Sequence, residues 1–160
     1  MDRLWTPWRY RYVSTSDSKD RCIFCEKAAS SDDRGNYVVL RADHNFVILN
    51  LYPYTTGHLM IAPYEHVATL AGASPETLQE MMILTARAET ALRKVYGPDG
   101  LNIGMNVGES AGAGVVGHIH MHVLPRWTGD GSFMTTVAET RVLPETLETT
   151  YDRVKAALHA

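Results

Sequence analysis

The sequence of 160 residues has few cysteines, no excess of positive charge and no long hydrophobic run. Its two cysteines, Cys22 and Cys25, are too few for the disulfide framework of many small secreted domains. The net charge is −3, whereas nucleic-acid-binding domains are typically basic. No apolar run approaches the roughly 20 residues of a membrane-spanning helix, and the first residues lack the apolar stretch of a secretory signal. We therefore expect a cytoplasmic protein that neither binds nucleic acid nor spans a membrane.

Short strands around one long helix are the main pattern that the sequence does contain. β-Branched runs bounded by turn residues predict strands over residues 37–41, 46–50, 58–62, 101–106 and 118–124. Ser74 as the N-cap, Pro75 at the first helical position and apolar residues at helical spacing predict a helix over 75–96. A weaker helix is predicted over about 144–159. This order favours an α+β fold with a mostly antiparallel sheet. Residues 1–20, which contain two tryptophans and two tyrosines, are expected to form an N-terminal aromatic arm, and residues 21–160 a single domain.

Three histidines at alternate positions are the strongest chemical signal. In a strand, His118, His120 and His122 lie on one face, while Ile119 and the residues that alternate with them enter the core. An ordinary solvated strand face is the weaker interpretation, because such a face normally carries Thr, Lys or Glu. A metal hydrolase with three histidine ligands is also unfavourable, because the first and third residues lie about 13 Å apart and Zn–N bonds are about 2.0–2.1 Å. At least one imidazole is therefore free to act as a nucleophile or in acid–base chemistry.

A glycine-rich loop precedes the histidine strand. It contains Gly108, Gly112, Gly114 and Gly117, and such a loop can direct consecutive backbone N–H groups at an anion. Alone, the loop is equally well explained as a flexible connection between strands. The adjacent histidines favour a phosphate site, which would let an acidic protein hold an anion through local donors.

Cys22 and Cys25 have the spacing of a metal-binding pair, but the sequence has no second pair of this kind. Two further ligands must come from elsewhere, and His66 and His118 are the candidates. A redox pair is disfavoured because no βαβ pattern follows and the two intervening residues are bulky. Buried structural thiols remain an alternative.

Together these motifs resemble the histidine-triad (HIT) superfamily of nucleotide hydrolases and transferases, over about residues 21–127. The most specific part is Gly-His-Ile-His-Met-His-Val-Leu-Pro-Arg-Trp, which ends at Trp127. The resemblance implies that residues 21–160 form one HIT domain, with a five-stranded mostly antiparallel sheet, one long helix and a C-terminal helix. It also implies a homodimer.

The resemblance further implies roles for individual residues. His120 would attack the α-phosphorus of a nucleotide and form a nucleotidyl-histidine intermediate, with its other ring nitrogen bonded to a backbone carbonyl. His122 would stabilise charge on the phosphate oxygens, and His58 would support the triad. The implied nucleotide-binding residues are Asn50 at the ribose, Asn106 beside the α-phosphate, and Gly108, Ser110, Gly112 and Gly114 in the loop. The implied ligands of a structural zinc are Cys22, Cys25, His66 and His118, and no catalytic metal or organic cofactor is implied.

The loop before the triad departs from the pattern of many hydrolase branches. Those branches have Gly-Gln followed by Ser or Thr, whereas residues 111–117 are longer and apolar here. With the Leu-Trp-Thr-Pro opening, this feature is similar to the bacterial branch of diadenosine tetraphosphate phosphorylases. In that branch inorganic phosphate, rather than water, takes the nucleotidyl group and ADP and ATP are released. The implied function is nucleotidyl transfer or hydrolysis on dinucleoside polyphosphates. An adenosine phosphoramidate hydrolase and a non-catalytic nucleotide-binding protein are the alternatives.

Overall fold

The computed structural model describes residues 21–138, 140 and 142–160, so the expected arm of residues 1–20 lies outside the described residues. The helices are α2 (Ile23–Ala29), α3 (Pro75–Tyr96), α4 (Phe133–Val137) and α5 (Leu147–Leu158), with 3-10 turns at Leu70–Gly72 and Glu109–Ala111. The strands are β1 (Val38–Arg41), β2 (Asn45–Leu49), β3 (Leu59–Pro63), β4 (Gly100–Gly104) and β5 (Met121–Arg126). No helix in the described part of the chain is long and apolar enough to cross a membrane.

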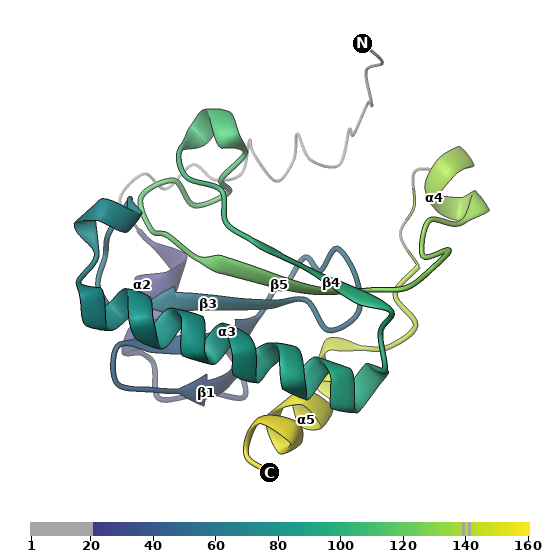
Figure 1. Ribbon diagram of the computed structural model, residues 1–160, viewed down its shortest axis with the longest axis horizontal. Helices are drawn as coiled ribbons and strands as arrows, with labels where there is room; N and C mark the ends of the chain where they lie inside the picture. Colours follow the sequence, from purple (N-terminus) through teal and green to yellow (C-terminus); the bar gives the residue numbers. More distant parts are fainter. Residues whose placement is uncertain (1–20, 139, 141) are drawn as a thin grey trace.

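All the described strands form one antiparallel sheet in the order β1-β2-β3-β5-β4. The first three strands follow one another as a meander, and β5 then lies between β3 and β4 (Figure 1). Strand β4 is consequently an edge of the sheet. The architecture confirms the expected α+β fold with a five-stranded antiparallel sheet, one long helix and a C-terminal helix.

The long helix α3 begins and ends where the sequence predicts. The Ser74 hydroxyl accepts a hydrogen bond from the Thr77 N–H, and Pro75 occupies the first turn, where no N–H is needed. The helix stops at Gly97, whose φ of 53° and ψ of 47° lie in the left-handed region that favours glycine. The buried side of α3 includes Leu84 and Leu92, and burying one such leucine contributes about 1.5–3 kcal/mol.

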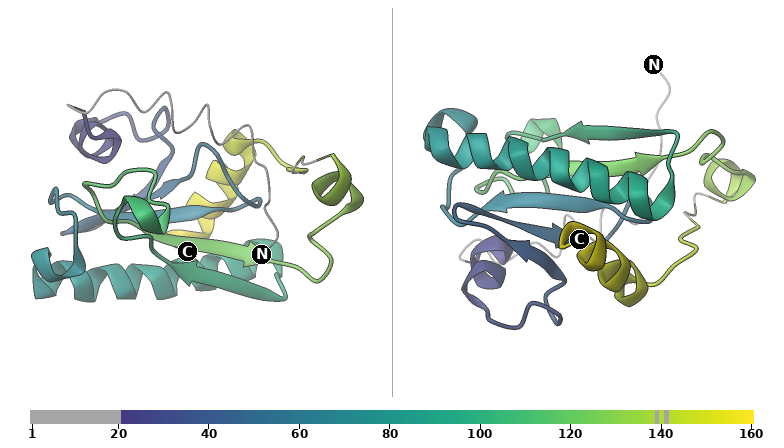
Figure 2. Two further views of the ribbon diagram at one scale, coloured as in Figure 1. Left: turned by 90° about the horizontal axis from the view of Figure 1, so that it is seen from above. Right: turned by 60° about the horizontal axis from the view of Figure 1, so that its bottom comes forward.

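The sheet separates two cores. Helices α3 and α5 pack against one face, and α2 lies on the opposite face (Figures 1 and 2). Alternation along β2 divides its residues accordingly: Val47 and Leu49 join the larger core under α3, whereas Phe46 and Ile48 pack with Phe24 of α2. This arrangement leaves the α2 face of β5 for the functional groups.

Besides shifts of one to three residues in the bounds of β1, β2, β3 and α5, four local features differ from the prediction. Helices α2 and α4 were not predicted, β4 spans Gly100–Gly104 rather than residues 101–106, and β5 begins at Met121 rather than at residue 118. Helix α2 has seven residues and no side-chain cap, so it depends on the packing of Phe24 rather than on local signals. Residues 118–120 lie outside the regular strand, because the Ile119 N–H bonds to the Val67 carbonyl instead of to a neighbouring strand.

Candidate functional site

The three alternating histidines lie on the face of the sheet opposite α3. Ile119 and Val123 are buried in the core under α3, while the rings of His118 and His120 pack on Phe24 of α2. Of the three histidines, only His122 lies within regular β5. His118 and His120 are nearly inaccessible to solvent, at 0% and 4% exposure. The backbone thus places the three imidazoles on one face, with His118 and His120 against α2, although these two precede the strand.

A backbone carbonyl fixes the orientation of His120. Its Nδ1 lies 2.9 Å from the carbonyl oxygen of His118. Because a carbonyl can only accept, Nδ1 carries the proton and Nε2 keeps its lone pair. Burial lowers the pKa of His120, against the opposing effect of the bond to His118. His120 is therefore neutral near pH 7, with an unprotonated Nε2, which is the form that a nucleophile requires.

A chain of hydrogen bonds determines which ring nitrogen of His122 carries the proton. The Tyr54 N–H lies 3.2 Å from Nδ1 of His58, and since an N–H can only donate, this nitrogen accepts and the His58 proton is on Nε2. That Nε2–H donates to Nδ1 of His122 at 2.9 Å. The remaining proton of neutral His122 is therefore on Nε2. Burial, helped by the neighbouring His120, lowers the pKa of His122 to about 4, so the ring is a neutral hydrogen-bond donor near pH 7.

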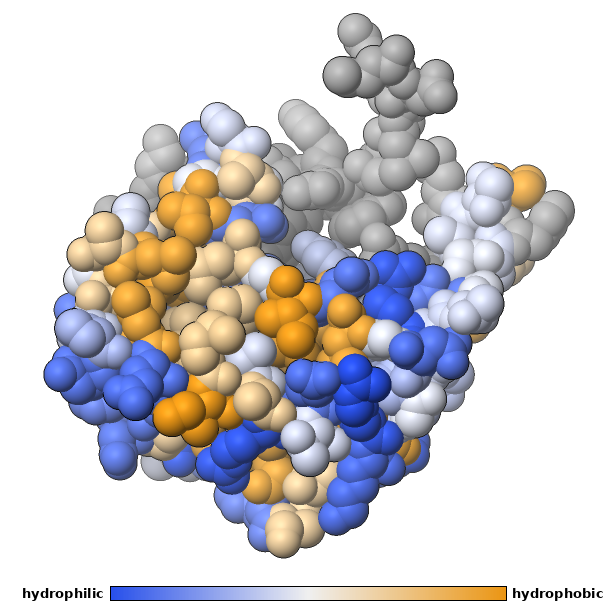
Figure 3. All heavy atoms as spheres, viewed as in Figure 1, coloured by the Kyte–Doolittle hydropathy of each residue, from blue (hydrophilic) through white to orange (hydrophobic). Residues whose placement is uncertain are grey.

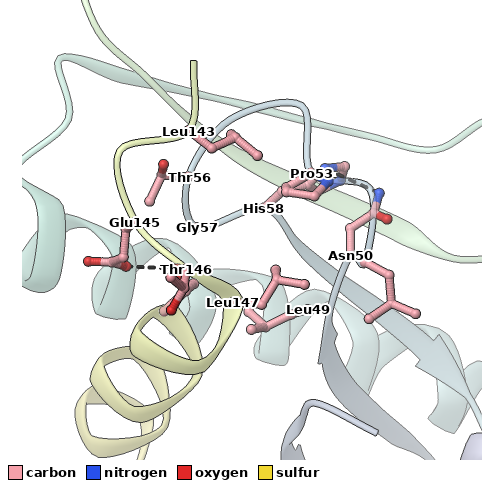
Figure 4. Close-up of a pocket in the computed structure, with 12 residues that line it drawn as sticks. Leu49, Asn50, Pro53, Thr56, Gly57, His58, Leu143, Glu145, Thr146 and Leu147 are labelled. Atoms are coloured by element: carbon pink, nitrogen blue, oxygen red, sulfur yellow. Dashed lines mark hydrogen bonds between the residues drawn. The ribbon is translucent and has the colours of Figure 1, made fainter. Parts of the chain in front are cut away.

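Asn50 lies at the outer end of this chain. Its Nδ2 approaches Nδ1 of His58 at 3.3 Å, and its Oδ1 accepts a hydrogen bond from the Tyr52 N–H at 2.9 Å. Figure 4 shows the Asn50 and His58 side chains pointing toward each other beside a cavity of about 230 Å³. The family resemblance implies only a ribose contact for Asn50, but the structure also gives it a contact with His58, which bonds to His122 of the triad.

Cys22, Cys25, His66 and His118 form a compact cluster whose ligand atoms all lie within 4.8 Å of one another. The closest pairs join Cys25 Sγ to His66 Nδ1 at 3.2 Å and Cys22 Sγ to His118 Nδ1 at 3.3 Å. Bonds of about 2.0–2.3 Å to a tetrahedral metal imply ligand–ligand distances of about 3.3–3.8 Å. These residues therefore fit a tetrahedral metal site with two sulfur and two nitrogen ligands, and they could hold a metal ion.

The surroundings of the cluster support this geometry. His118 Nε2 donates to the Pro63 carbonyl at 2.8 Å, which leaves Nδ1 facing the sulfurs. A methyl group at Gly117 would come within 3.3 Å of His66 Nε2, so glycine gives the His66 ring room beside the chain. The metal cluster and the triad share His118: its ring faces the cysteines, and its carbonyl orients His120.

The glycine loop is organised largely by its own hydrogen bonds. Gly108 and Gly112 both have a φ of 86°, in the region that favours glycine. The N–H groups of residues 111–113 bond back to carbonyls of residues 108 and 109, and Asn106 Nδ2 lies 3.4 Å from the Gly112 carbonyl. An anion in this loop would consequently use other N–H groups. Ser110 and Gly114 are exposed, and among the described residues no hydrogen bond joins them to the triad.

Sequence reasoning missed two contributors to the site. In the sequence Phe24 is only one of two bulky residues between the cysteines, yet its ring lies 4.8 Å from that of His120. The Tyr54 N–H, which sets the His58 tautomer, has no signal in the sequence because every residue except proline has such a group. The aromatic character of Phe24 was visible, but its position depended on the unpredicted helix α2.

Comparison with known proteins points to one family. Residues 33–129 match the HIT domain. A relative named AP-4-A phosphorylase, from Mycobacterium tuberculosis, is 37% identical over 158 residues, which cover 94% of this chain and 80% of the relative.

Solved structures of the same kind resemble the fold. A Zn-bound histidine triad family protein from Mycobacterium smegmatis has a TM-score of 0.70 and 33% identity, covering 86% of this chain and 93% of that one. A hypothetical histidine triad nucleotide-binding protein from Sulfolobus tokodaii has a TM-score of 0.69 and 26% identity, with coverages of 86% and 92%.

Proposed function

The chain belongs to the HIT domain family, and from this premise we propose that it is an enzyme that transfers the adenylyl group of diadenosine tetraphosphate or a related dinucleoside polyphosphate. The hydrogen bond from His120 Nδ1 to the His118 carbonyl carries the proposal, because it leaves Nε2 available for attack. The 37% identity to a relative named AP-4-A phosphorylase supports the substrate class and inorganic phosphate as the acceptor.

The proposed reaction has two steps. His120 Nε2 attacks the α-phosphorus, the P–N bond forms, and the P–O bond to ATP breaks. Nδ1–H then shares the positive charge of the modified ring with the His118 carbonyl. Inorganic phosphate next attacks the same phosphorus, the P–N bond breaks, and ADP leaves with His120 restored as the neutral ring. Diadenosine tetraphosphate and phosphate thus give ATP and ADP.

His122 and His58 stabilise the charge that develops on the phosphate oxygens. His122 donates through Nε2–H, and His58 keeps that proton in place by donating to Nδ1. Because both rings are neutral, no proton has to be moved before the donor acts. Loss of one such preorganised donor typically lowers kcat by about 10²–10³. Asn50 and Asn106, with Gly108, Ser110, Gly112 and Gly114, remain the proposed nucleotide-binding residues.

Cys22, Cys25, His66 and His118 are proposed to hold a structural zinc ion. The two-sulfur, two-nitrogen donor set and its spacing support zinc, as does the Zn-bound relative of similar fold. A metal bound by four protein ligands has no open position for substrate. Its contribution is to tie the start of α2 to the segment that carries His120.

The proposed activity is tested by incubating the protein with diadenosine tetraphosphate, with and without inorganic phosphate, and separating the products. ADP and ATP that form only with phosphate support phosphorolysis, whereas AMP and ATP without phosphate indicate a hydrolase. No cleavage, together with turnover of adenosine phosphoramidate, would favour the alternative hydrolase. His120→Gly is the control: it should abolish turnover but keep nucleotide affinity, whereas a pure binding protein has no turnover to lose.

We further propose a cytoplasmic homodimer that pairs through α3 and β4. Strand β4 lies at an edge of the sheet formed by the described strands, and the exposed fractions of Ile103, Met82 and Ile83 are 44%, 57% and 53%. Figure 3 shows hydrophobic surface over α3 and β4 on this face. Sheet edges and apolar patches of this kind are typical of protein interfaces. An Ile103→Lys variant should elute as a monomer in light-scattering chromatography, and a monomeric wild type would contradict the proposal.

A further inference from the structure

A cavity of about 770 Å³ lies next to the triad along β5. Leu124, which lines it, follows His122 by two residues and therefore projects from the same face of the strand. Tyr54 also lines the cavity, and its ring stacks over that of His122 with centroids 6.2 Å apart and an interplanar angle of 21°. From these residues on the histidine face, the cavity extends around the end of β5 that leads to α4 (Figure 1), where Tyr96 of α3 and Arg153 of α5 also line it.

The charged groups around this cavity neutralise one another. Arg126 pairs with Asp130 at 2.5 Å, and Arg153 pairs with Glu145 at 2.5 Å. A polyphosphate chain would find no unpaired positive charge among these four lining residues. The cavity is therefore suited to an uncharged group, whereas the phosphates are better held by the imidazoles and backbone donors of the triad region.

Aromatic side chains form part of the cavity wall. Tyr96 is held in place because its hydroxyl donates to Glu145 and the Arg153 guanidinium lies 4.8 Å from its ring centroid. Trp127 meets Tyr96 edge to face, with centroids 6.4 Å apart. Small-molecule pockets typically have volumes of about 300–1,000 Å³ and are rich in aromatic residues. A flat heteroaromatic base with its ribose fits both the size and the chemistry of this cavity.

We propose that the cavity binds the second nucleoside of a dinucleoside polyphosphate, on the leaving-group side of His120; this inference rests on the proposed function. In an in-line displacement, the leaving group departs on the side opposite the attacking nitrogen. On one side of His120 lie Phe24 and the metal cluster. On the other side β5 continues over His122 to the cavity, which begins about 7 Å beyond His122 at the spacing of alternate strand residues.

The test uses substrates with and without the second nucleoside. Trp127→Ala removes an aromatic wall, and Thr135→Trp fills the cavity from α4. Thr136→Trp is the matched control, because its exposed neighbour position does not line the cavity. Stacking of one base on an aromatic side chain contributes binding free energy that corresponds to about a tenfold change in affinity. Both cavity variants should therefore lower kcat/KM for diadenosine tetraphosphate about tenfold. Turnover of adenosine phosphoramidate, which has one nucleoside, should stay at the level of the Thr136→Trp control.

A binding measurement separates failure of this inference from failure of the proposed function. In a His120→Asn background, calorimetry compares diadenosine tetraphosphate with adenosine tetraphosphate, which lacks the second nucleoside. We expect about tenfold tighter binding of the dinucleotide, and loss of that ratio in Thr135→Trp but not in Thr136→Trp. Equal affinities of the two ligands in the His120→Asn background would overturn the inference. An equal loss of affinity for both ligands in Thr135→Trp would also overturn it. A wild-type protein that binds but does not cleave the dinucleotide would instead contradict the proposed function.

Discussion

Acid should destabilise this protein through His122. The ring has a pKa of about 4 in the folded chain, because of burial and the nearby His120, and the usual 6.5 when unfolded. The unfolded chain therefore binds the extra proton between these two values, so the stability is fully present above pH 6.5 and is lost as the pH falls toward 4. A difference of about 2.5 pKa units corresponds to about 3 kcal/mol. Below pH 4 both states are protonated, and this loss does not increase further.

The His122→Asn variant isolates this effect. The asparagine Oδ1 can accept the hydrogen bond that His58 donates to Nδ1 in the wild type, but the amide does not titrate in this range. Urea unfolding at pH 7.0, 5.5 and 4.5, at constant ionic strength, gives the free energy of unfolding of both proteins. The wild type should lose about 2–3 kcal/mol more than the variant across this range, because the other histidines are common to both. If the difference in unfolding free energy between the wild type and the variant stays constant with pH, the assignment of a neutral, buried His122 is refuted.

Three further changes test the metal cluster and the fold. Cys22→Ser should reduce bound zinc below the expected one ion per chain, measured by mass spectrometry of the metal, and should lower the thermal midpoint; a wild type without metal would contradict the site. Glu80→Ala should cost about 1–3 kcal/mol in urea unfolding, because this carboxylate accepts from two backbone N–H groups and from the buried Asn45. Gly57→Ala should cost at least about 1–2 kcal/mol, since its φ is 82° and a methyl group would lie 2.8 Å from the ring of the last α3 residue. The control Gly131→Ala has open space around it and should be nearly neutral in the same assay.

Features that depend on residues close together in the sequence, such as the limits of α3 and the two faces of the histidine segment, were predicted. Ser74 and Pro75 mark the start of α3, and the period of two along residues 118–123 assigns histidines and apolar residues to opposite faces. The order β1-β2-β3-β5-β4 could not be predicted, because it depends on pairing between segments far apart in the sequence. Helix α2 was missed because seven residues without a cap give too weak a periodic signal.

The candidate site was predicted at the level of side chains but not of backbone groups. The cysteine spacing made His66 and His118 candidate ligands, and the family resemblance implied the same four residues that the structure brings within 4.8 Å. By contrast, the carbonyl of His118 and the N–H of Tyr54 determine which ring nitrogens carry protons. Every residue has a carbonyl, so only the folded chain identifies the ones that act. Asn50 is similar: its contact with His58 depends on the turn between β2 and β3.

The most direct test of the central claim is detection of the covalent intermediate on His120. The protein is mixed with diadenosine tetraphosphate without inorganic phosphate, quenched rapidly, digested and examined by mass spectrometry. The account predicts one adenylyl group on the peptide that contains His120, its disappearance when phosphate is added, and formation of ADP at the same rate. Turnover without any adduct, or an adduct that persists in His120→Gly, would contradict it.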